Sequence, residues 1–321
     1  MAKSKILVTA AGSIGERHIR NLWQLGFRDI LVFRTRNLPF RDLGDANVTV
    51  VLDWQEALNA GADAAFVTSP THLHMQQTLD CLNAGMHVFV EKPIAHHLEQ
   101  ETELYRTLEK SKKVLQVGYM LEFHPFLMEM KRVCQNETLG KLISAECYWG
   151  DYLPNWHPWE DYKTGYAAKG EMGGGVALTL SHEIDTALWL VGKTPSKTIT
   201  IKNKLSALPM DADNLTEVVM QFENEASARV HVNYVEKKAK RYNTLLFENG
   251  RLTFHYFEDT LRIEDFEKET SETKTLPNFD RNDLFMSETE CFFERIKNND
   301  IQDMEGLKRA FEVVKICTGN E

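Results

Sequence analysis

Residues 5–22 constrain the fold more than any other stretch of the chain. A short apolar run (residues 6–8) is typical of a strand buried on both faces. A turn of small residues (10–15) follows it, and then an amphipathic helical pattern runs to Leu22. A strand, a tight turn and a helix in this order bring backbone N–H groups and a helix N-terminus to one point. That point suits a pyrophosphate.

The glycine pattern of this turn supports a dinucleotide site, although it is incomplete. Ala10 stands where the first glycine of the G-x-G-x-x-G pattern would serve the tight turn. Gly12 keeps the position where backbone approaches phosphate, and Gly15 the position where helix packs on strand. Ala10, Gly12, Ser13 and Ile14 are therefore predicted cofactor contacts. The alternative is an ordinary strand-to-helix turn of a doubly wound sheet.

Composition excludes several functions. The formal net charge is −10 over 321 residues, and an acidic surface attracts neither nucleic acid nor an anionic membrane. The five cysteines are scattered and form no C-x-x-C pair, which indicates reduced thiols and no zinc site. No apolar run reaches the length of a membrane span or of a signal-peptide core. We therefore expect a soluble cytoplasmic protein.

The second predicted strand, residues 29–33, ends where the adenosine ribose would lie. An acid at this point would accept from the 2′-hydroxyl, whereas arginines suit a 2′-phosphate. The chain has no acid there and continues with Arg34, Thr35 and Arg36. These three residues are predicted cofactor contacts, so NADP(H) is favoured over NAD(H). A solvated basic loop is the alternative.

Strands and helices alternate through the first third of the chain. Further strands are predicted at 48–52, 63–68, 87–90 and 114–118, and helices at 54–59, after Thr71 and at 98–110. This alternation specifies a doubly wound parallel sheet, a Rossmann domain over residues 1–121. Such sheets bind ligands at the carboxyl ends of their strands. Further cofactor contacts are therefore predicted at Ser69, Pro70, His74, Glu91 and Lys92.

Residues 122–321 are predicted to form a second α/β domain. Consecutive strands from Lys197 to Ile263 have no helix between them, which indicates an open, mainly antiparallel sheet. The charged residues 258–272 are interpreted as a solvated edge. The other predicted elements are helices at 126–134, from the triple glycine to near Trp189, at 284–297 and at 304–317, and a strand at 142–149.

The segment Glu91-Lys92-Pro93 follows the strand predicted at 87–90. A lysine there can donate a proton or hold a substrate hydroxyl, and the glutamate beside it can fix its position. The proline would stiffen the loop. Lys92 is therefore a candidate catalytic residue, with a plain surface Glu–Lys pair as the alternative.

His182 lies on the apolar helix that follows Gly173-Gly174-Gly175. Apolar neighbours imply burial, and a buried histidine is usually a hydrogen-bonded core residue. Here the triple glycine would allow a ligand to approach the backbone, and Asp185 is spaced to orient the imidazole ring. The segment lacks the second histidine of a zinc-protease helix, so no metal is predicted.

Aromatic residues crowd one loop of the second domain. Flat apolar faces edged by polar groups suit sugar rings. A self-packed loop or a subunit contact is the alternative. The aromatic residues are Tyr148, Trp149, Tyr152, Trp156, Trp159, Tyr162 and Tyr166, edged by Asp151, Asn155, His157, Asp161 and Lys163.

Several segments together resemble the Gfo/Idh/MocA family of sugar-type dehydrogenases. The resemblance spans the chain in the family's order, and is closest to members that act on surface-polysaccharide or sialic-acid-like sugars. It rests on the turn at residues 12–18 (GSIGERH), Ser69 to His74 (SPTHLH), Glu91-Lys92-Pro93, Gly118 to Pro125 (GYMLEFHP), and the triple glycine with Ser181 to Asp185 (SHEID).

The resemblance implies catalytic roles for Lys92 and His182. In the oxidising direction His182 would take the hydroxyl proton as hydride moves to the nicotinamide, and Lys92 would hold the same oxygen. A homodimer or homotetramer formed through the open sheet is also expected. Tyr119, Trp156, Lys163, Thr179 and Asp185 are the residues predicted to bind the sugar.

Two positions depart from the family pattern. Thr179 and Leu178 stand where an aspartate usually precedes the histidine, and Glu122 stands where relatives carry arginine. Thr179 can hydrogen-bond a substrate but cannot do acid–base work at neutral pH. Two alternatives to a dehydrogenase therefore stay open. One is an epimerase or glycoside hydrolase that oxidises its sugar transiently, and the other is a catalytically silent dinucleotide sensor.

Overall fold

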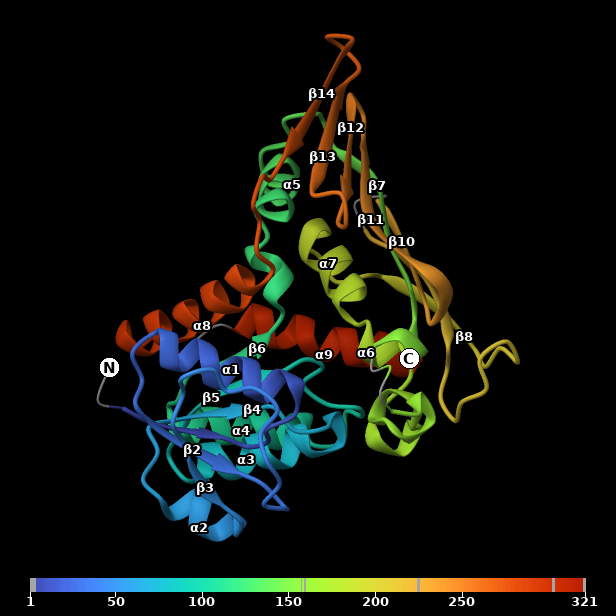
Figure 1. Cartoon of the computed structure of the whole chain (residues 1–321). Helices are drawn as coiled ribbons and strands as arrows, with labels where there is room; N and C mark the ends of the chain where they lie inside the picture. The colour runs from blue at the N-terminus through green and yellow to red at the C-terminus, as the bar shows by residue number, and fades with distance from the viewer. Residues whose placement is uncertain (1–3, 157, 159, 224–225, 302–303, 320–321) are drawn as a thin grey trace. The chain divides into compact units, whose positions relative to one another are not determined.

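The computed structural model describes residues 4–156, 158, 160–223, 226–301 and 304–319. The chain forms two compact units, which are described separately. The first comprises Met1–Tyr119 with Asn282–Phe311, and the second Met120–Arg281 with Glu312–Glu321. Figure 1 labels the elements of both along the chain.

A six-stranded sheet forms the centre of the first unit. Its order is β3-β2-β1-β4-β5-β6, and every pair is parallel. This confirms the predicted Rossmann arrangement, in which the strand order reverses between β1 and β4. The strands are β1 (Lys5–Val8), β2 (Asp29–Phe33), β3 (Thr49–Val51), β4 (Ala64–Val67), β5 (His87–Glu91) and β6 (Leu115–Gly118).

Helices pack in the first unit, and buried apolar residues of these helices share one core with the sheet. Ile6, Ile19, Phe66 and Phe89 are fully buried in that core, as continuous apolar strands require. The helices are α1 (Ser13–Gln24), α2 (Trp54–Asn59), α3 (His74–Asn83), α4 (Glu101–Ser111) and α8 (Asn282–Lys297), with a short 3-10 turn, η1 (Thr71–Leu73), before α3.

Helix α8 differs from the predicted division of the chain at residue 121. The sequence prediction placed everything after that point in the second domain, but Asn282–Phe311 belongs to the first unit. The reason is aromatic packing, because Phe292 is buried with its ring centroid 5.6 Å from Phe66 and 5.9 Å from Phe89.

An eight-stranded sheet dominates the second unit, in the order β14-β13-β12-β11-β7-β10-β9-β8. Its pairs are antiparallel except β7 with β10, which confirms a mainly antiparallel sheet. The strands are β7 (Leu142–Tyr152), β8 (Lys197–Asn203), β9 (Leu215–Gln221), β10 (Ser227–Asn233), β11 (Val235–Phe247), β12 (Gly250–His255), β13 (Thr260–Asp265) and β14 (Thr270–Thr275).

The helices of this unit depart from prediction in one place. A single helix was predicted after the triple glycine, but the chain forms α6 and α7 with a break at Leu180 and Ser181. The helices are α5 (Pro125–Asn136), α6 (Val176–Thr179), α7 (His182–Val191) and α9 (Met304–Thr318), whose first residues belong to the first unit. Short 3-10 turns are η2 (Met120–Phe123), η3 (Leu153–Asn155), η4 (Tyr162–Thr164), η5 (Tyr166–Ala168) and η6 (Gly170–Met172).

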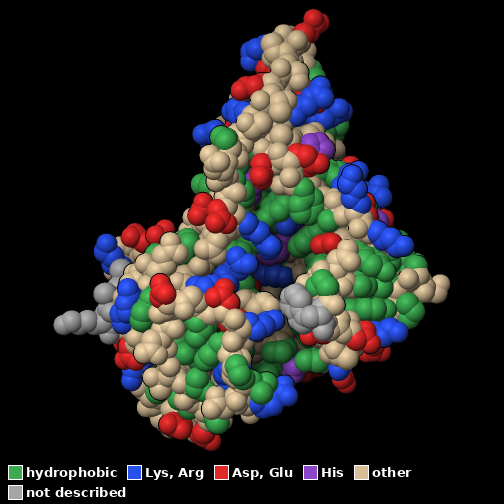
Figure 2. Space-filling model, in the orientation of Figure 1, with side chains coloured by type: hydrophobic (Ala, Val, Ile, Leu, Met, Phe, Trp, Pro, Cys, Tyr) green, Lys and Arg blue, Asp and Glu red, His purple; other side chains and the backbone are tan. Residues whose placement is uncertain are grey.

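One face of the large sheet packs against helices, and the other is open. Ile199 and Ile201 of β8 and Val219 of β9 are about half exposed on the open face, at 49%, 54% and 48%. Figure 2 shows hydrophobic side chains over the side of the second unit that carries β8. Among the described residues, no helix has the length and apolar character needed to cross a membrane.

Candidate active site

The glycine turn lies between β1 and α1, where the strand order reverses. Helix α1 begins at Ser13, and a Cβ placed on Gly12 would meet nothing within 4 Å. There is thus open space beside the backbone of Gly12 at the start of α1, which leaves room for a pyrophosphate. A Cβ on Gly15 would lie 1.9 Å from the Ala10 carbonyl oxygen, so this position requires glycine for helix-on-strand packing, as predicted.

The basic loop after β2 contacts this turn through a residue that the sequence analysis missed. Arg41 Nη2 donates to the Ser13 hydroxyl at 3.1 Å. Glu16 of α1 accepts from the backbone N–H groups of Arg41 (2.9 Å) and Asp42 (3.2 Å), which holds the loop against the helix. Arg41 lies only five residues beyond Arg36, but its contact with Ser13 depends on the path of the loop.

The three predicted contacts in this loop have different surroundings. Arg34 is half-buried, with its guanidinium 4.5 Å from the Phe40 ring centroid and a hydrogen bond to the Leu38 carbonyl. Thr35 and Arg36 are exposed. The three residues directly after β2 thus include two arginines and no acid.

His74 joins the loops that follow β4 and β5. Its Nε2 lies 2.7 Å from the Ser69 carbonyl oxygen and its Nδ1 2.7 Å from the Pro93 carbonyl oxygen. Burial lowers the pKa of His74, and the two carbonyl contacts act in the opposite direction. Ser69, His74 and the Glu-Lys-Pro segment are thereby brought together, next to Pro70.

The Glu-Lys-Pro segment follows β5 directly. The Lys92–Pro93 peptide bond is cis. Glu91 is buried, Lys92 is half-buried, and the Glu91 carboxylate accepts from the Lys92 backbone N–H at 3.3 Å. Tyr119, a predicted sugar contact, is buried at the end of the first unit's N-terminal segment.

In the second unit, the triple glycine leads into α6. Gly175 has φ +100°, and a Cβ there would lie 2.4 Å from Asp213 Oδ1. Asp213 caps α6 in place of a local residue. Its carbonyl accepts from Val176 N at 2.9 Å, and its carboxylate accepts from Ala177 N at 3.0 Å. Asp213 was not predicted from the sequence, because it lies 36 residues beyond the helix that it caps.

His182 begins α7 and is 5% exposed. The next residue, Glu183, is fully buried and binds Arg241 of β11, with Arg241 Nε donating to Oε1 at 2.7 Å. Burial raises the pKa of Glu183, and Arg241 acts to lower it. The Arg241 guanidinium also lies 4.0 Å from the Trp149 ring centroid. This buried pair fixes α7, and with it His182, on the sheet.

Thr179 and Trp156 meet at Tyr234. The buried Tyr234 hydroxyl donates to the Gly175 carbonyl oxygen at 3.4 Å. Burial raises the pKa of Tyr234 well above its usual value, and the side chain of Thr179 acts in the opposite direction. Trp156 packs edge-on against the same ring, with centroids 5.3 Å apart. Tyr234 therefore links Trp156 of the aromatic loop with Thr179, the residue in the family's aspartate position. Tyr234 was not predicted as a site residue from the sequence.

Other predicted sugar contacts are not in this group. Lys163 is exposed and lies over the ring of its neighbour Tyr162, at 5.9 Å. Asp185 is buried on α7. His157 and Trp159 of the aromatic loop lie outside the described residues.

The two units together define a dinucleotide-fold oxidoreductase. Residues 4–119 match the model of the oxidoreductase family with an NAD-binding Rossmann fold, and residues 127–253 match the GFO/IDH/MocA C-terminal domain. The chain therefore belongs to the Gfo/Idh/MocA family of oxidoreductases, and its first unit carries the NAD(P)-binding domain.

Individual relatives are distant. The chain is 28% identical over 196 residues to an inositol 2-dehydrogenase of Klebsiella pneumoniae, covering 58% of this chain and 54% of that protein. It is 27% identical over 183 residues to a 1,5-anhydro-D-fructose reductase of Ensifer adhaerens, covering 56% and 52%. The matched region thus spans little more than half the length of these curated relatives.

Solved structures share the fold across nearly the whole chain. A levoglucosan dehydrogenase in complex with NADH and levoglucosan has a TM-score of 0.84 at 15% identity, covering 98% of this chain and 95% of that one. A UDP-N-acetylglucosamine 3-dehydrogenase of Acidithiobacillus ferrooxidans has a TM-score of 0.77 at 17% identity, covering 99% and 97%.

Proposed function

We propose that this chain is an NAD(P)-dependent oxidoreductase that acts on a hydroxyl or keto group of a carbohydrate, with NADP(H) preferred. The observation that carries the proposal is the cluster at the carboxyl ends of β1, β4 and β5. There the Ala10 carbonyl of the glycine turn accepts from Thr68 Oγ1 at 2.8 Å, and His74 joins the Ser69 loop to the loop of Lys92. Such strand ends are where doubly wound sheets bind their ligands.

The dinucleotide would be held by residues of the first unit. The N–H groups at the start of α1 would hold the pyrophosphate, and Arg34, Arg36 and Arg41 would face a 2′-phosphate. When bound, the nicotinamide supplies the hydride acceptor or donor. The absence of an acid at the end of β2 supports the preference for NADP(H).

The chain's own residues would move the proton. In the oxidising direction His182, as the neutral base, takes the proton of the substrate hydroxyl, and in the reducing direction it returns that proton. Lys92 holds the same oxygen and favours its deprotonated form by charge. Thr179, whose side chain acts on the pKa of Tyr234, would donate to or accept from the sugar without changing its protonation state.

The aromatic loop would bind the flat face of the sugar. Trp156 is half-buried and packs perpendicular to the Tyr234 ring, and its indole would stack on the axial C–H groups of the sugar. Names of relatives indicate cyclic polyols, anhydrosugars and nucleotide-linked amino sugars as the classes to test. A surface-polysaccharide or sialic-acid-like sugar is the finer proposal from the sequence resemblance.

Thermal stabilisation tests the binding half of this proposal. The melting temperature would be followed with a panel of those sugars, alone and with NADPH or NADH, because a ligand that binds the native state raises it by mass action. We expect NADPH alone to stabilise, and one sugar class to add to its effect. No stabilisation by either cofactor would contradict the proposal.

A further inference from the structure

His18 is an unusual residue for the core position that it occupies. It lies on α1, its side chain is fully buried, and the rings of Phe66, Phe89 and Phe285 surround it at 5.3, 5.1 and 6.2 Å between centroids. An imidazole in apolar surroundings is costly unless a polar contact compensates. The identity of that contact therefore indicates why a histidine is used here.

The contact is with Glu91. His18 Nε2 lies 2.7 Å from Glu91 Oε1, while Glu91 Oε2 accepts from the backbone N–H of Lys92 at 3.3 Å. One buried carboxylate thus connects α1 to the backbone of Lys92. Burial acts to raise the pKa of Glu91, but the hydrogen bond and charge of His18 and the charge of Lys92 hold it below its ordinary value. Ionised Glu91 keeps both oxygens as acceptors.

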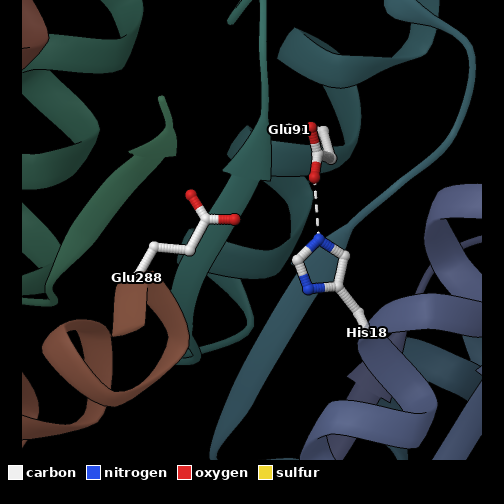
Figure 3. A group of neighbouring side chains, drawn as sticks. All are labelled: His18, Glu91 and Glu288. Carbon is white, nitrogen blue, oxygen red and sulfur yellow. Dashed lines mark hydrogen bonds and ion pairs between the residues drawn. The ribbon is translucent and has the colours of Figure 1, made fainter. Parts of the chain in front are cut away.

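A second carboxylate completes the cluster. Figure 3 shows His18 of α1, Glu91 of β5 and Glu288 of α8 directed toward one another, and one polar atom from each lies within 4.8 Å of the others. All three side chains are buried. Carboxylates this close repel each other, and a positive charge between them reduces the repulsion.

Either the His18 imidazole or a divalent cation could lie against the Glu91 carboxylate. The 2.7 Å distance from His18 Nε2 to Glu91 Oε1 is that of a direct, charge-assisted hydrogen bond. An ion held by both atoms, with bonds of about 2 Å, would lie between them and separate them further. The geometry therefore favours a direct hydrogen bond between His18 and Glu91 over a bound cation.

We propose that His18 is a positioning residue for Lys92 that acts through Glu91. His18 fixes the Glu91 carboxylate, and the carboxylate fixes the Lys92 backbone from which the ammonium group projects. Because the same helix starts at the glycine turn, α1 would set Lys92 in register with a bound cofactor. The inference rests on the role of Lys92 in the proposed function.

The NMR signals of lysines methylated with ¹³C report on this directly, and Lys92→Arg would assign the Lys92 signal. We expect His18→Leu, which keeps the bulk but removes the donor, to displace and broaden that signal. His18→Gln, which keeps an N–H donor toward Glu91, should restore it to near its wild-type position. His87→Leu is the matched control, because His87 also lies on β5 but accepts from Val114 N, at 3.0 Å.

An unchanged Lys92 signal in folded His18→Leu, or an equal displacement in His87→Leu, would overturn the inference. Should His18→Leu not fold, Glu91→Gln carries the test with the same two outcomes. Metal analysis tests the alternative. A stoichiometric ion whose removal by a chelator moves the Lys92 signal would show that a bound cation, and not the His18 hydrogen bond, fixes Glu91. These readouts need no sugar turnover, so they are independent of whether the proposed activity is found.

Discussion

Substitution of Lys92 is expected to change turnover without changing cofactor affinity. If Lys92 holds the reacting oxygen, Lys92→Ala should lower turnover by about 10²-fold or more, with cofactor affinity nearly unchanged. Lys110→Ala, at the exposed end of α4, is a matched control and should leave both quantities unchanged. Steady-state rates and NADPH titrations of the three proteins measure this. Near-normal turnover in Lys92→Ala would remove the residue from the mechanism.

Cofactor choice is also decided by single side chains. A charge-assisted contact between arginine and phosphate contributes about 1.5–3 kcal/mol, or roughly one to two decades of affinity. We therefore expect NADPH to bind more tightly than NADH, and Arg34→Ala to narrow the difference by weakening NADPH. Arg28→Ala is the control, because that guanidinium lies over Trp23, at 4.2 Å.

Fluorescence titration of both reduced cofactors checks this expectation. Arg34 already lies against Phe40, so it could instead stack on adenine without touching the phosphate. Equal losses for NADPH and NADH in Arg34→Ala would favour that stacking and contradict the phosphate contact.

Roles of single residues were predictable from the sequence where the contacting residues are near in the chain, and not where they are far apart. Gly15 was interpretable because its role lies within one strand–turn–helix unit. Asp213 capping α6 and Arg241 binding Glu183 were not, because those contacts join residues 36 and 58 positions apart. No periodicity in the chain encodes such pairings.

At the scale of elements, hydrophobic pattern located most strands and helices of both units. It missed β14, because the residues Thr270–Thr275 are almost all exposed and give no alternation of buried and exposed positions. It also merged α6 and α7, since the break at Leu180 and Ser181 lies inside a continuous apolar stretch that contains no proline. The break is what places His182 at the start of its own helix.

Helix α5 gives a pH-dependent prediction for an element. Its N-cap is His124, whose Nδ1 accepts from the Phe126 backbone N–H at 3.2 Å and must be unprotonated to do so. Burial, assisted by Arg241, lowers the pKa of His124 to about 4. Between pH 6.5 and 4 the unfolded chain therefore binds a proton that the native state does not, and stability falls as pH falls.

We expect the titration of His124 to lower the free energy of unfolding by about 2 kcal/mol between pH 7 and pH 5. His124→Asn keeps an acceptor at the N-cap but does not titrate. Its free energy of unfolding should therefore fall less over the same pH interval. Urea unfolding at both pH values measures the difference, with His255→Asn on β12 as the control. Equal acid losses in wild type and His124→Asn would refute the assignment.

At the scale of the whole molecule, the division into units was the hardest feature to predict. The pattern of strands ends the Rossmann sheet at the correct strand, but nothing local in residues 282–297 shows that their phenylalanines belong to the first unit's core. A helix with an apolar side could pack on either unit. Which unit it joins depends on the shape of the apolar surface that each unit offers, and the sequence of the helix does not show that shape.

The open face of the large sheet bears on assembly. Ile199, Ile201 and Val219 leave apolar area exposed there, which is typical of a surface covered by a second copy. We expect a homodimer or homotetramer at micromolar concentration, and Ile201→Lys should shift it toward monomer. Leu52→Lys changes an equally exposed leucine of the first unit and should have no effect. Sedimentation that shows only monomer for the wild type would contradict this.

The central claim is a net transfer of hydride between a carbohydrate and an added cofactor. The direct measurement is the absorbance of NADP⁺ or NADPH mixed with the enzyme and the sugar that stabilises it most, in wild type and in His182→Asn. We predict a sugar-dependent change that continues through many turnovers in wild type and falls by about 10²-fold or more in His182→Asn. Sugar conversion without net change in the cofactor would indicate an epimerase or hydrolase, and binding without any conversion a silent sensor; either result would contradict the proposed activity.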